Sequence, residues 1–244
     1  MAKKARRQDF DPSFFRGIAH RGLHDETRTE NGLAAFQNAI DRGLCFELDI
    51  HLTKDDELLV CHDSELERTT GKKGIIEELT LEEIRRDYRL LDGGVVPTYQ
   101  EVLDLTQEKT LIVTELKTYK GNYKALAKKT MEALAQIKDK KKITIISFDP
   151  RALLYCKKGG FTRGLLIYNK RTDIFLVRNF FEYLDLEDCL LQDKRAVSYR
   201  KKGGIINTWT IEKEEQLNQI NGLCDAITFQ HLPVEEAVEF ASKL

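Results

Sequence analysis

Three carboxylates in short apolar segments could together hold a metal ion. Glu47 and Asp49 lie in the segment 45–50, and Glu115 ends the segment 111–115. Side chains two residues apart on a strand point the same way, so Glu47 and Asp49 should project together. Carboxylates crowded in apolar surroundings repel one another unless a cation neutralises them, and ligation by oxygen alone favours Ca²⁺, Mg²⁺ or Mn²⁺ over zinc. The alternative is that each acid pairs with a lysine at the surface.

Two histidines end apolar segments in the same way. His20 closes the segment 18–20, and His62 follows the segment 58–61 directly. Imidazole exchanges protons near neutral pH, so two such groups at one site could act as general base and general acid. Each could instead be a core histidine with satisfied hydrogen bonds. Their occurrence beside the acidic set favours the catalytic interpretation.

Two cationic side chains adjoin these groups. Arg21 follows His20, and Lys117 lies two residues beyond Glu115. Fixed positive charge suits an anionic phosphate better than a neutral substrate, although either residue could form a structural salt bridge. The set therefore points to chemistry on a phosphate group.

The elements that must position these residues alternate between short apolar segments and longer segments with helical periodicity. Eight strand and helix units in about 250 residues are what an α/β protein of the (β/α)8 barrel type needs, and an open doubly wound sheet is the rival. In such a barrel the strand ends share one face, where catalytic groups collect. The predicted strands are 18–20, 45–50, 111–115, 143–147, 164–167, 188–191, 205–209 and 225–229, and the predicted helices are 30–41, 99–106, 123–138, 150–158 and 212–220.

One segment interrupts this alternation. Residues 51–97 are too long for a simple barrel loop and contain a turn near Asp55 followed by another apolar run. We interpret them as a hairpin and a small insertion after the second strand. No linker or repeat separates this segment, so residues 1–244 should form a single domain.

Composition excludes several classes of partner. Lys+Arg 39 against Asp+Glu 40 leaves a net charge of -1, which gives no reason to expect nucleic acid or an anionic membrane as partner. The basic start of the chain is followed by no apolar run, and no segment approaches the roughly 18 apolar residues of a membrane helix. We expect a cytoplasmic protein without stable membrane insertion, and the sequence leaves its oligomeric state open.

Several segments, in this order and spacing, resemble the signature of the glycerophosphodiester phosphodiesterase family, in particular its bacterial, non-secreted members. The resemblance covers the chain from about residue 17 to the C-terminus. The segments that carry it are Ala19-His20-Arg21-Gly22, Glu30 to Phe36, Glu47 to Asp55, His62 to Thr70, Val96 to Leu103, Thr114 to Lys117, Ser147-Phe148-Asp149 and Asn207 to Thr210.

The resemblance implies a barrel with a small insertion after its second strand and a divalent metal ion, Ca²⁺, Mg²⁺ or Mn²⁺. It implies that Glu47, Asp49 and Glu115 bind this metal, that His20 and His62 act as acid and base, and that Arg21 and Lys117 contact phosphate. Trp209 matches a position that lines the substrate channel. Glu30 and Asn31 match a motif near the site, where they would bind the metal as well or support its ligands.

The reaction implied is hydrolysis of a glycerophosphodiester, a small molecule, to sn-glycerol 3-phosphate and an alcohol. Related lysophospholipase D enzymes, which act on lipids, are an alternative, and a catalytically silent barrel that binds phosphorylated ligands is another. The sequence does not decide the head group, the metal or which histidine is the acid. It also departs from the family at Gln230, where an aspartate is usual, and at Thr29 and Gly32, which flank the Glu-Asn pair.

Overall fold

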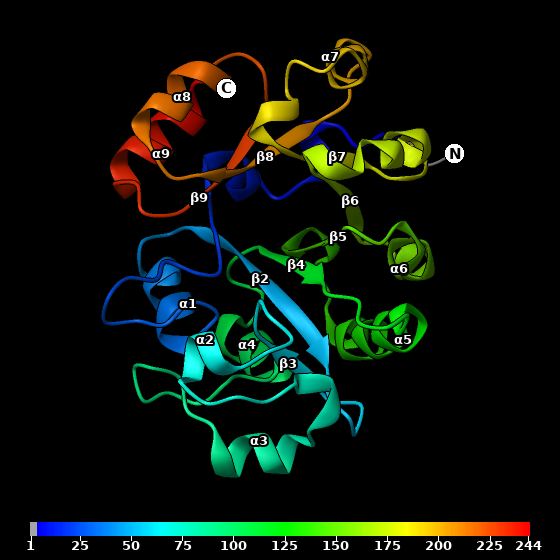
Figure 1. Cartoon of the computed structure of the whole chain (residues 1–244). Coiled ribbons are helices and arrows are strands. Elements are labelled where there is room, and N and C mark those ends of the chain that lie inside the picture. Colours follow the sequence, from blue (N-terminus) through cyan, green and yellow to red (C-terminus); the bar gives the residue numbers. More distant parts are fainter. Residues whose placement is uncertain (1–3) are drawn as a thin grey trace.

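Eight parallel strands form a closed barrel in the computed structural model, which describes residues 4–244 (Figure 1). The first barrel strand pairs with both the second and the last, and this pairing closes the barrel. The predicted (β/α)8 fold is therefore confirmed. The barrel strands are β1 (Ile18–Ala19), β2 (Cys45–Leu52), β4 (Ile112–Leu116), β5 (Ile143–Ser147), β6 (Thr162–Ile167), β7 (Tyr183–Glu187), β8 (Ile206–Ile211) and β9 (Ala226–Phe229).

Helices surround the barrel and cover the outward faces of its strands (Figure 1). Strand segments rich in Ile, Val and Leu suit this position, because strands of a parallel barrel are buried on both faces. Local signals set helix starts: Thr98 caps the helix that follows it, and Glu101 completes the capping box. The outer helices are α1 (Leu33–Asp41), α4 (Tyr99–Thr106), α5 (Tyr123–Ala133), α6 (Pro150–Tyr155), α7 (Lys194–Lys201), α8 (Glu214–Ile220) and α9 (Val234–Ser242), and a 3-10 segment, Asn169–Phe180, follows β6.

One predicted strand is wrong. We expected a strand at 188–191, whereas β7 ends at Glu187 and residues Asp188–Leu190 form a 3-10 turn. The strand itself carries two acids, Asp185 and Glu187, on alternate positions. These acids interrupt the apolar pattern by which a buried strand is recognised in a sequence. Leu190 and Leu191 are buried beneath the turn. Their hydrophobicity therefore reflects packing of a loop rather than strand formation.

An N-terminal segment closes the end of the barrel opposite the carboxyl ends of its strands. The 3-10 helix Pro12–Arg16 contacts β1, β2, β9 and α9. The rings of Phe10 and Phe14 pack edge-on against Tyr183 at the start of β7, with centroids 5.4 Å apart in both pairs. These aromatic side chains belong to the core inside the barrel, and they exclude solvent from this end.

The segment 51–97 forms an additional layer beside the end of β2 (Figure 1). Strand β3 (Leu58–Val60) pairs antiparallel with β2, and α2 (Glu67–Thr70), a 3-10 turn (Ile76–Glu78) and α3 (Leu81–Asp87) follow. The segment has its own small core, which comprises Leu59, Cys61, Leu66, Ile76, Ile84, Tyr88, Leu90 and Val96. We interpret it as an insertion within a single domain.

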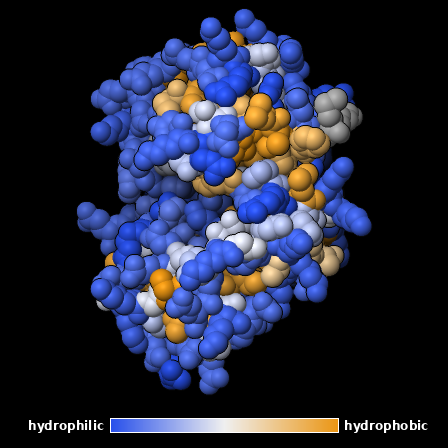
Figure 2. All heavy atoms as spheres, turned by 45° about the vertical axis from the view of Figure 1, so that its right-hand side comes forward, coloured by the Kyte–Doolittle hydropathy of each residue, from blue (hydrophilic) through white to orange (hydrophobic). Residues whose placement is uncertain are grey.

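The outer surface is mainly polar. Hydrophilic side chains cover most of the face in Figure 2, and hydrophobic ones gather mainly in its upper right part. None of the helices in residues 4–244 combines the length and hydrophobicity that a membrane crossing needs.

Candidate active site

The three predicted metal ligands lie together on two neighbouring strands of the barrel. Glu47 and Asp49 come from β2 and Glu115 from β4, with Asp49 directly opposite Glu115 in the strand register. One oxygen of each carboxylate lies within 4.8 Å of the others, and all three side chains are buried. Burial and mutual repulsion raise the pKa of Glu47 well above its ordinary value, and burial raises that of Glu115 to about 7. The cluster is therefore unfavourable without positive charge.

Protein groups supply part of that charge. Lys117 Nζ lies 3.0 Å from Glu115 Oε1 and 3.4 Å from Asp49 Oδ1. Although burial opposes it, the charges of Lys117, His62 and Arg21 lower the pKa of Asp49. Asp49 Oδ1 is nevertheless buried without a hydrogen bond from any described residue. An all-oxygen donor set in which one buried oxygen accepts no hydrogen bond fits a hard divalent cation.

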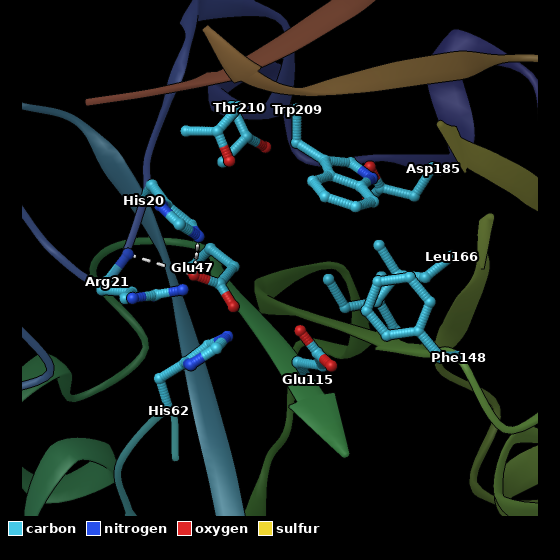
Figure 3. Close-up of a pocket in the computed structure, with 12 residues that line it drawn as sticks. His20, Arg21, Glu47, His62, Glu115, Phe148, Leu166, Asp185, Trp209 and Thr210 are labelled. Atoms are coloured by element: carbon cyan, nitrogen blue, oxygen red, sulfur yellow. Dashed lines mark hydrogen bonds and ion pairs between the residues drawn. The ribbon is translucent and has the colours of Figure 1, made fainter. Parts of the chain in front are cut away.

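His20 follows β1 and faces the carboxylates (Figure 3). Its Nδ1 lies 2.6 Å from Gln230 Oε1, and its Nε2 lies 3.9 Å from Glu47 Oε2. An amide oxygen can only accept, so Nδ1 carries the proton and Nε2 presents its lone pair to the site. Burial, with the charge of Arg21, lowers the pKa of His20 to about 4. Gln230 thus orients the ring at the position where the family usually has aspartate.

Arg21 adopts a left-handed backbone conformation, φ 55°, and connects several of these groups. Its backbone N–H donates to Glu47 Oε2 at 3.0 Å, and its guanidinium donates to Glu30 at 2.8 Å. Gly22 continues the turn with φ 80°, and a Cβ there would lie 2.9 Å from the carbonyl carbon of Ala35. The His-Arg-Gly sequence is therefore a turn that only glycine can complete.

His62 reaches the site from the hairpin beyond β3. Its Nδ1 donates to Asp63 Oδ1 at 2.7 Å, because a carboxylate can only accept. A hydrogen bond of 3.1 Å joins the backbone carbonyl of His62 to the His51 ring. Burial lowers the pKa of His62, and Asp49 and Asp63 oppose this effect. The free Nε2 can therefore serve as a second proton-transfer atom.

Glu30 and Asn31 lie beside the cluster in different ways. Asn31 donates to Asp49 Oδ2 at 2.9 Å and so orients a predicted metal ligand. Glu30 is not part of the carboxylate cluster. Its two oxygens instead accept hydrogen bonds from Arg21 and Arg68. Although burial opposes it, these arginines lower the pKa of Glu30 to about 2. The structure thus favours supporting roles for both residues, and these roles remain predictions.

The opposite wall of the cavity is largely apolar (Figure 3). Trp209 projects from β8, and its ring meets Phe148 edge-on with centroids 5.6 Å apart. The cavity brings these groups together with both histidines, Glu47 and Glu115. Leu166 and the buried Asp185, whose pKa burial raises to about 7, complete this side. One half of the cavity is thus charged and the other can contact a less polar group.

Sequence reasoning missed three of these residues. Phe148 lies in a segment that carried the family resemblance, but no role was assigned to it. Asp185 was hidden because its strand was placed too late in the chain. Arg68 also lies in a segment that carried the resemblance, 62–70, but no role was assigned to it, because its partners Asp63 and Glu30 are brought to it only in the folded chain.

Comparison with known proteins places the chain in a family. Residues 20–229 match the model of the glycerophosphoryl diester phosphodiesterase family. The chain belongs to this family. The match includes every residue that we predicted to act at the site.

Relatives and solved structures agree with this assignment. A glycerophosphodiester phosphodiesterase of Caldanaerobacter subterraneus is 35% identical over 153 residues, which are 58% of this chain and 61% of the relative. The chain thus spans about three fifths of the length of that curated relative. The Thermotoga maritima glycerophosphodiester phosphodiesterase is 25% identical with a TM-score of 0.74, and the alignment covers 93% of this chain and 97% of the other. A phosphodiesterase of Oleispira antarctica, solved with its product sn-glycerol-3-phosphate, shares the fold at 21% identity and TM-score 0.81, covering 94% and 97% of the chains.

A further match is short. Human lysophospholipase D is 46% identical over 63 residues, which are 25% of this chain and 20% of the human protein. The similarity covers a quarter of this chain, so it does not extend to the whole protein.

Proposed function

We propose that the protein is a metal-dependent phosphodiesterase that hydrolyses glycerophosphodiesters to sn-glycerol 3-phosphate and an alcohol. The observation that carries this proposal is that two imidazoles, a guanidinium and two carboxylates line one cavity of the barrel, and that Asp49 and Lys117 lie directly against these carboxylates. Membership of the family supports it, as does the product named for the Oleispira antarctica phosphodiesterase.

The carboxylates Glu47, Asp49 and Glu115 are proposed to hold a divalent cation, Ca²⁺, Mg²⁺ or Mn²⁺. When bound, the cation would supply positive charge that stabilises the developing charge on the phosphate. Arg21 and Lys117 would bind the phosphate oxygens from the same side. Arg21 Nε lies 3.6 Å and Lys117 Nζ lies 3.4 Å from the carboxylate oxygens of Asp49. The same two cations would therefore stabilise both the bound phosphate and the carboxylate cluster.

The two histidines are proposed to transfer protons. Each ring has its Nδ1 engaged, His20 with Gln230 and His62 with Asp63, so each presents Nε2 as the working atom. One would take the proton of the attacking hydroxyl or water, and the other would give a proton to the leaving alkoxide. Trp209 would line the channel that receives the substrate. The cytoplasmic location expected from the sequence remains a prediction.

The test measures release of sn-glycerol 3-phosphate from a panel of glycerophosphodiesters. The expected result is turnover by the wild type and a loss of at least about 10²-fold in His20→Gln and in His62→Gln, because each removes a proton-transfer group. His231→Gln is a matched control, since His231 lies outside the cavity residues, and it should retain wild-type turnover. Near-wild-type rates in both site variants would contradict the assignment.

A lysophospholipase D activity is the second candidate, supported by the 63-residue match and by the apolar wall of the cavity. Parallel assays with glycerophosphocholine and lysophosphatidylcholine separate the two. Faster turnover of lysophosphatidylcholine would replace our first proposal with the second.

A further inference from the structure

Arg68 is not among the residues that line the cavity, but two carboxylates link it to two residues that are, His62 and Arg21. Its Nε donates to Asp63 Oδ2 at 2.6 Å. Its two terminal nitrogens donate to the two oxygens of Glu30 at 2.7 and 2.8 Å. All three nitrogens of the guanidinium therefore donate to carboxylates, a geometry that lysine cannot reproduce.

Each of these carboxylates holds a different residue of the site. The second oxygen of Asp63 accepts from His62 Nδ1 at 2.7 Å, and Glu30 Oε1 also accepts from the Arg21 guanidinium at 2.8 Å. The result is one continuous chain of charge-assisted hydrogen bonds from His62 to Arg21. It joins the insertion, which supplies His62 and Arg68, to the turn after β1.

This connection matters because the two ends come from separate elements. Figure 3 shows the His62 ring and the Arg21 side chain both directed toward the carboxylates from the same side of the cavity. His62 and Asp63 are about one third exposed, so packing alone does not fix them. Without Arg68, Asp63 would lose the cation that orients it, and Glu30 would retain only Arg21 as a partner.

We infer that Arg68 is a positioning residue, which holds the His62 ring through Asp63 and the Arg21 guanidinium through Glu30. The inference rests on the proposed function for its kinetic consequences, although the geometry it describes does not. Arg68 touches neither of the two residues directly, and it acts by restricting the carboxylates between them.

The kinetic test compares Arg68→Met and Arg68→Lys with the wild type in the sn-glycerol 3-phosphate assay. Arg68→Met should lower kcat by about 10- to 100-fold, the range typical of groups that orient a site from outside, and Arg68→Lys should not restore it. Arg86→Met is the control, because Arg86 is another exposed arginine of the insertion, pairs with an acid that has no link to the site, Asp87, and does not line the cavity. It should behave as the wild type. An Arg68→Met variant that matches this control would overturn the inference.

A double-mutant cycle separates positioning from a general effect on folding. In a His62→Gln background, Arg68→Met should cost markedly less than in the wild type, because the ring that it positions is already absent. Equal losses in the two backgrounds would show that Arg68 acts independently of His62, against the inference.

A spectroscopic measurement tests the positioning of the His62 ring without relying on activity. If the wild type hydrolyses no glycerophosphodiester, that failure counts against the proposed function alone, and this measurement still tests the role of Arg68. In protein labelled with ¹⁵N-histidine, the His62 Nδ1–H signal should be protected from exchange in the wild type and in Arg86→Met, and lost in Arg68→Met. A protected signal in Arg68→Met would refute the positioning role.

Discussion

At the residue scale, the site is defined by the hydrogen bonds and ion pairs that each buried polar side chain forms. The sequence indicated seven polar residues because each lies within, at the end of, or directly beyond a short apolar segment, where a buried polar group is costly unless it has a partner: His20, Arg21, Glu47, Asp49, His62, Glu115 and Lys117. It indicated no role for Arg68 or Asp185. Their significance depends on partners such as Glu30 and Asn207, which only the folded chain brings within hydrogen-bonding distance.

A substitution within the carboxylate cluster should separate stability from function. Glu47→Gln removes one of three mutually repelling buried carboxylates but keeps an oxygen that can accept from the Arg21 backbone N–H. We expect the metal-free variant to unfold a few degrees above the wild type, since relief of about 1 kcal/mol corresponds to about 2–4 °C in a chain of this size. Metal affinity should fall sharply.

Differential scanning calorimetry without metal, followed by titration with Mg²⁺ or Ca²⁺, tests both halves of this prediction. Gln37→Glu, which adds an acid on an exposed part of α1 instead, serves as a charge control and should leave metal affinity unchanged. A destabilised metal-free Glu47→Gln protein would show that repulsion does not dominate the cluster.

At the element scale, turns and strand ends decide where the chemistry lies. The parallel strands were predicted well where β-branched and apolar residues predominate and no charged residue intervenes, as in 143–147, because burial on both faces leaves that pattern. They were predicted poorly at β7, where Asp185 and Glu187 interrupt the pattern. An acid inside a barrel is stabilised by its tertiary neighbours, here Asn207, and local sequence does not reveal these.

The turn after β1 gives a prediction at this scale. Gly22→Ala should destabilise the fold by about 2 kcal/mol or more, since it combines a positive φ with a close approach to the backbone of Ala35. It should also lower turnover, because the strain displaces Arg21. Gly43→Ala is the matched control: φ there is 67°, but nothing lies within 4 Å of the added Cβ, so only the conformational cost of about 1 kcal/mol applies.

Chemical denaturation of the two variants gives the comparison. Equal losses of unfolding free energy in Gly22→Ala and Gly43→Ala would show that the contact with α1 does not constrain the turn.

At the scale of the whole molecule, the barrel is closed at one end and open at the other. Phe10 and Phe14 seal the end where the strands begin, whereas the opposite end carries the cavity with its charged and apolar halves. The insertion adds His62 to that open end. The closed end of the barrel thus contributes mainly to stability, and the open end carries the residues proposed to act in catalysis.

Metal binding should therefore stabilise the whole domain, because the cation neutralises carboxylates that the native state keeps buried together. A ligand present at about 100 times its dissociation constant adds about 2.7 kcal/mol to the free energy of unfolding. Thermal denaturation with Mg²⁺, Ca²⁺ or Mn²⁺ should show a rise in Tm that Glu115→Gln abolishes. An equal rise in both proteins would place the binding elsewhere.

The central claim is that the carboxylate cluster, once occupied by a metal, enables cleavage of a glycerophosphodiester. The most direct measurement is release of sn-glycerol 3-phosphate from glycerophosphocholine by protein stripped with a chelator, before and after addition of Ca²⁺, Mg²⁺ or Mn²⁺. We predict no release from the stripped protein and recovery with at least one of these ions. Undiminished release from the stripped protein, or none with any ion across a panel of glycerophosphodiesters, would contradict the account.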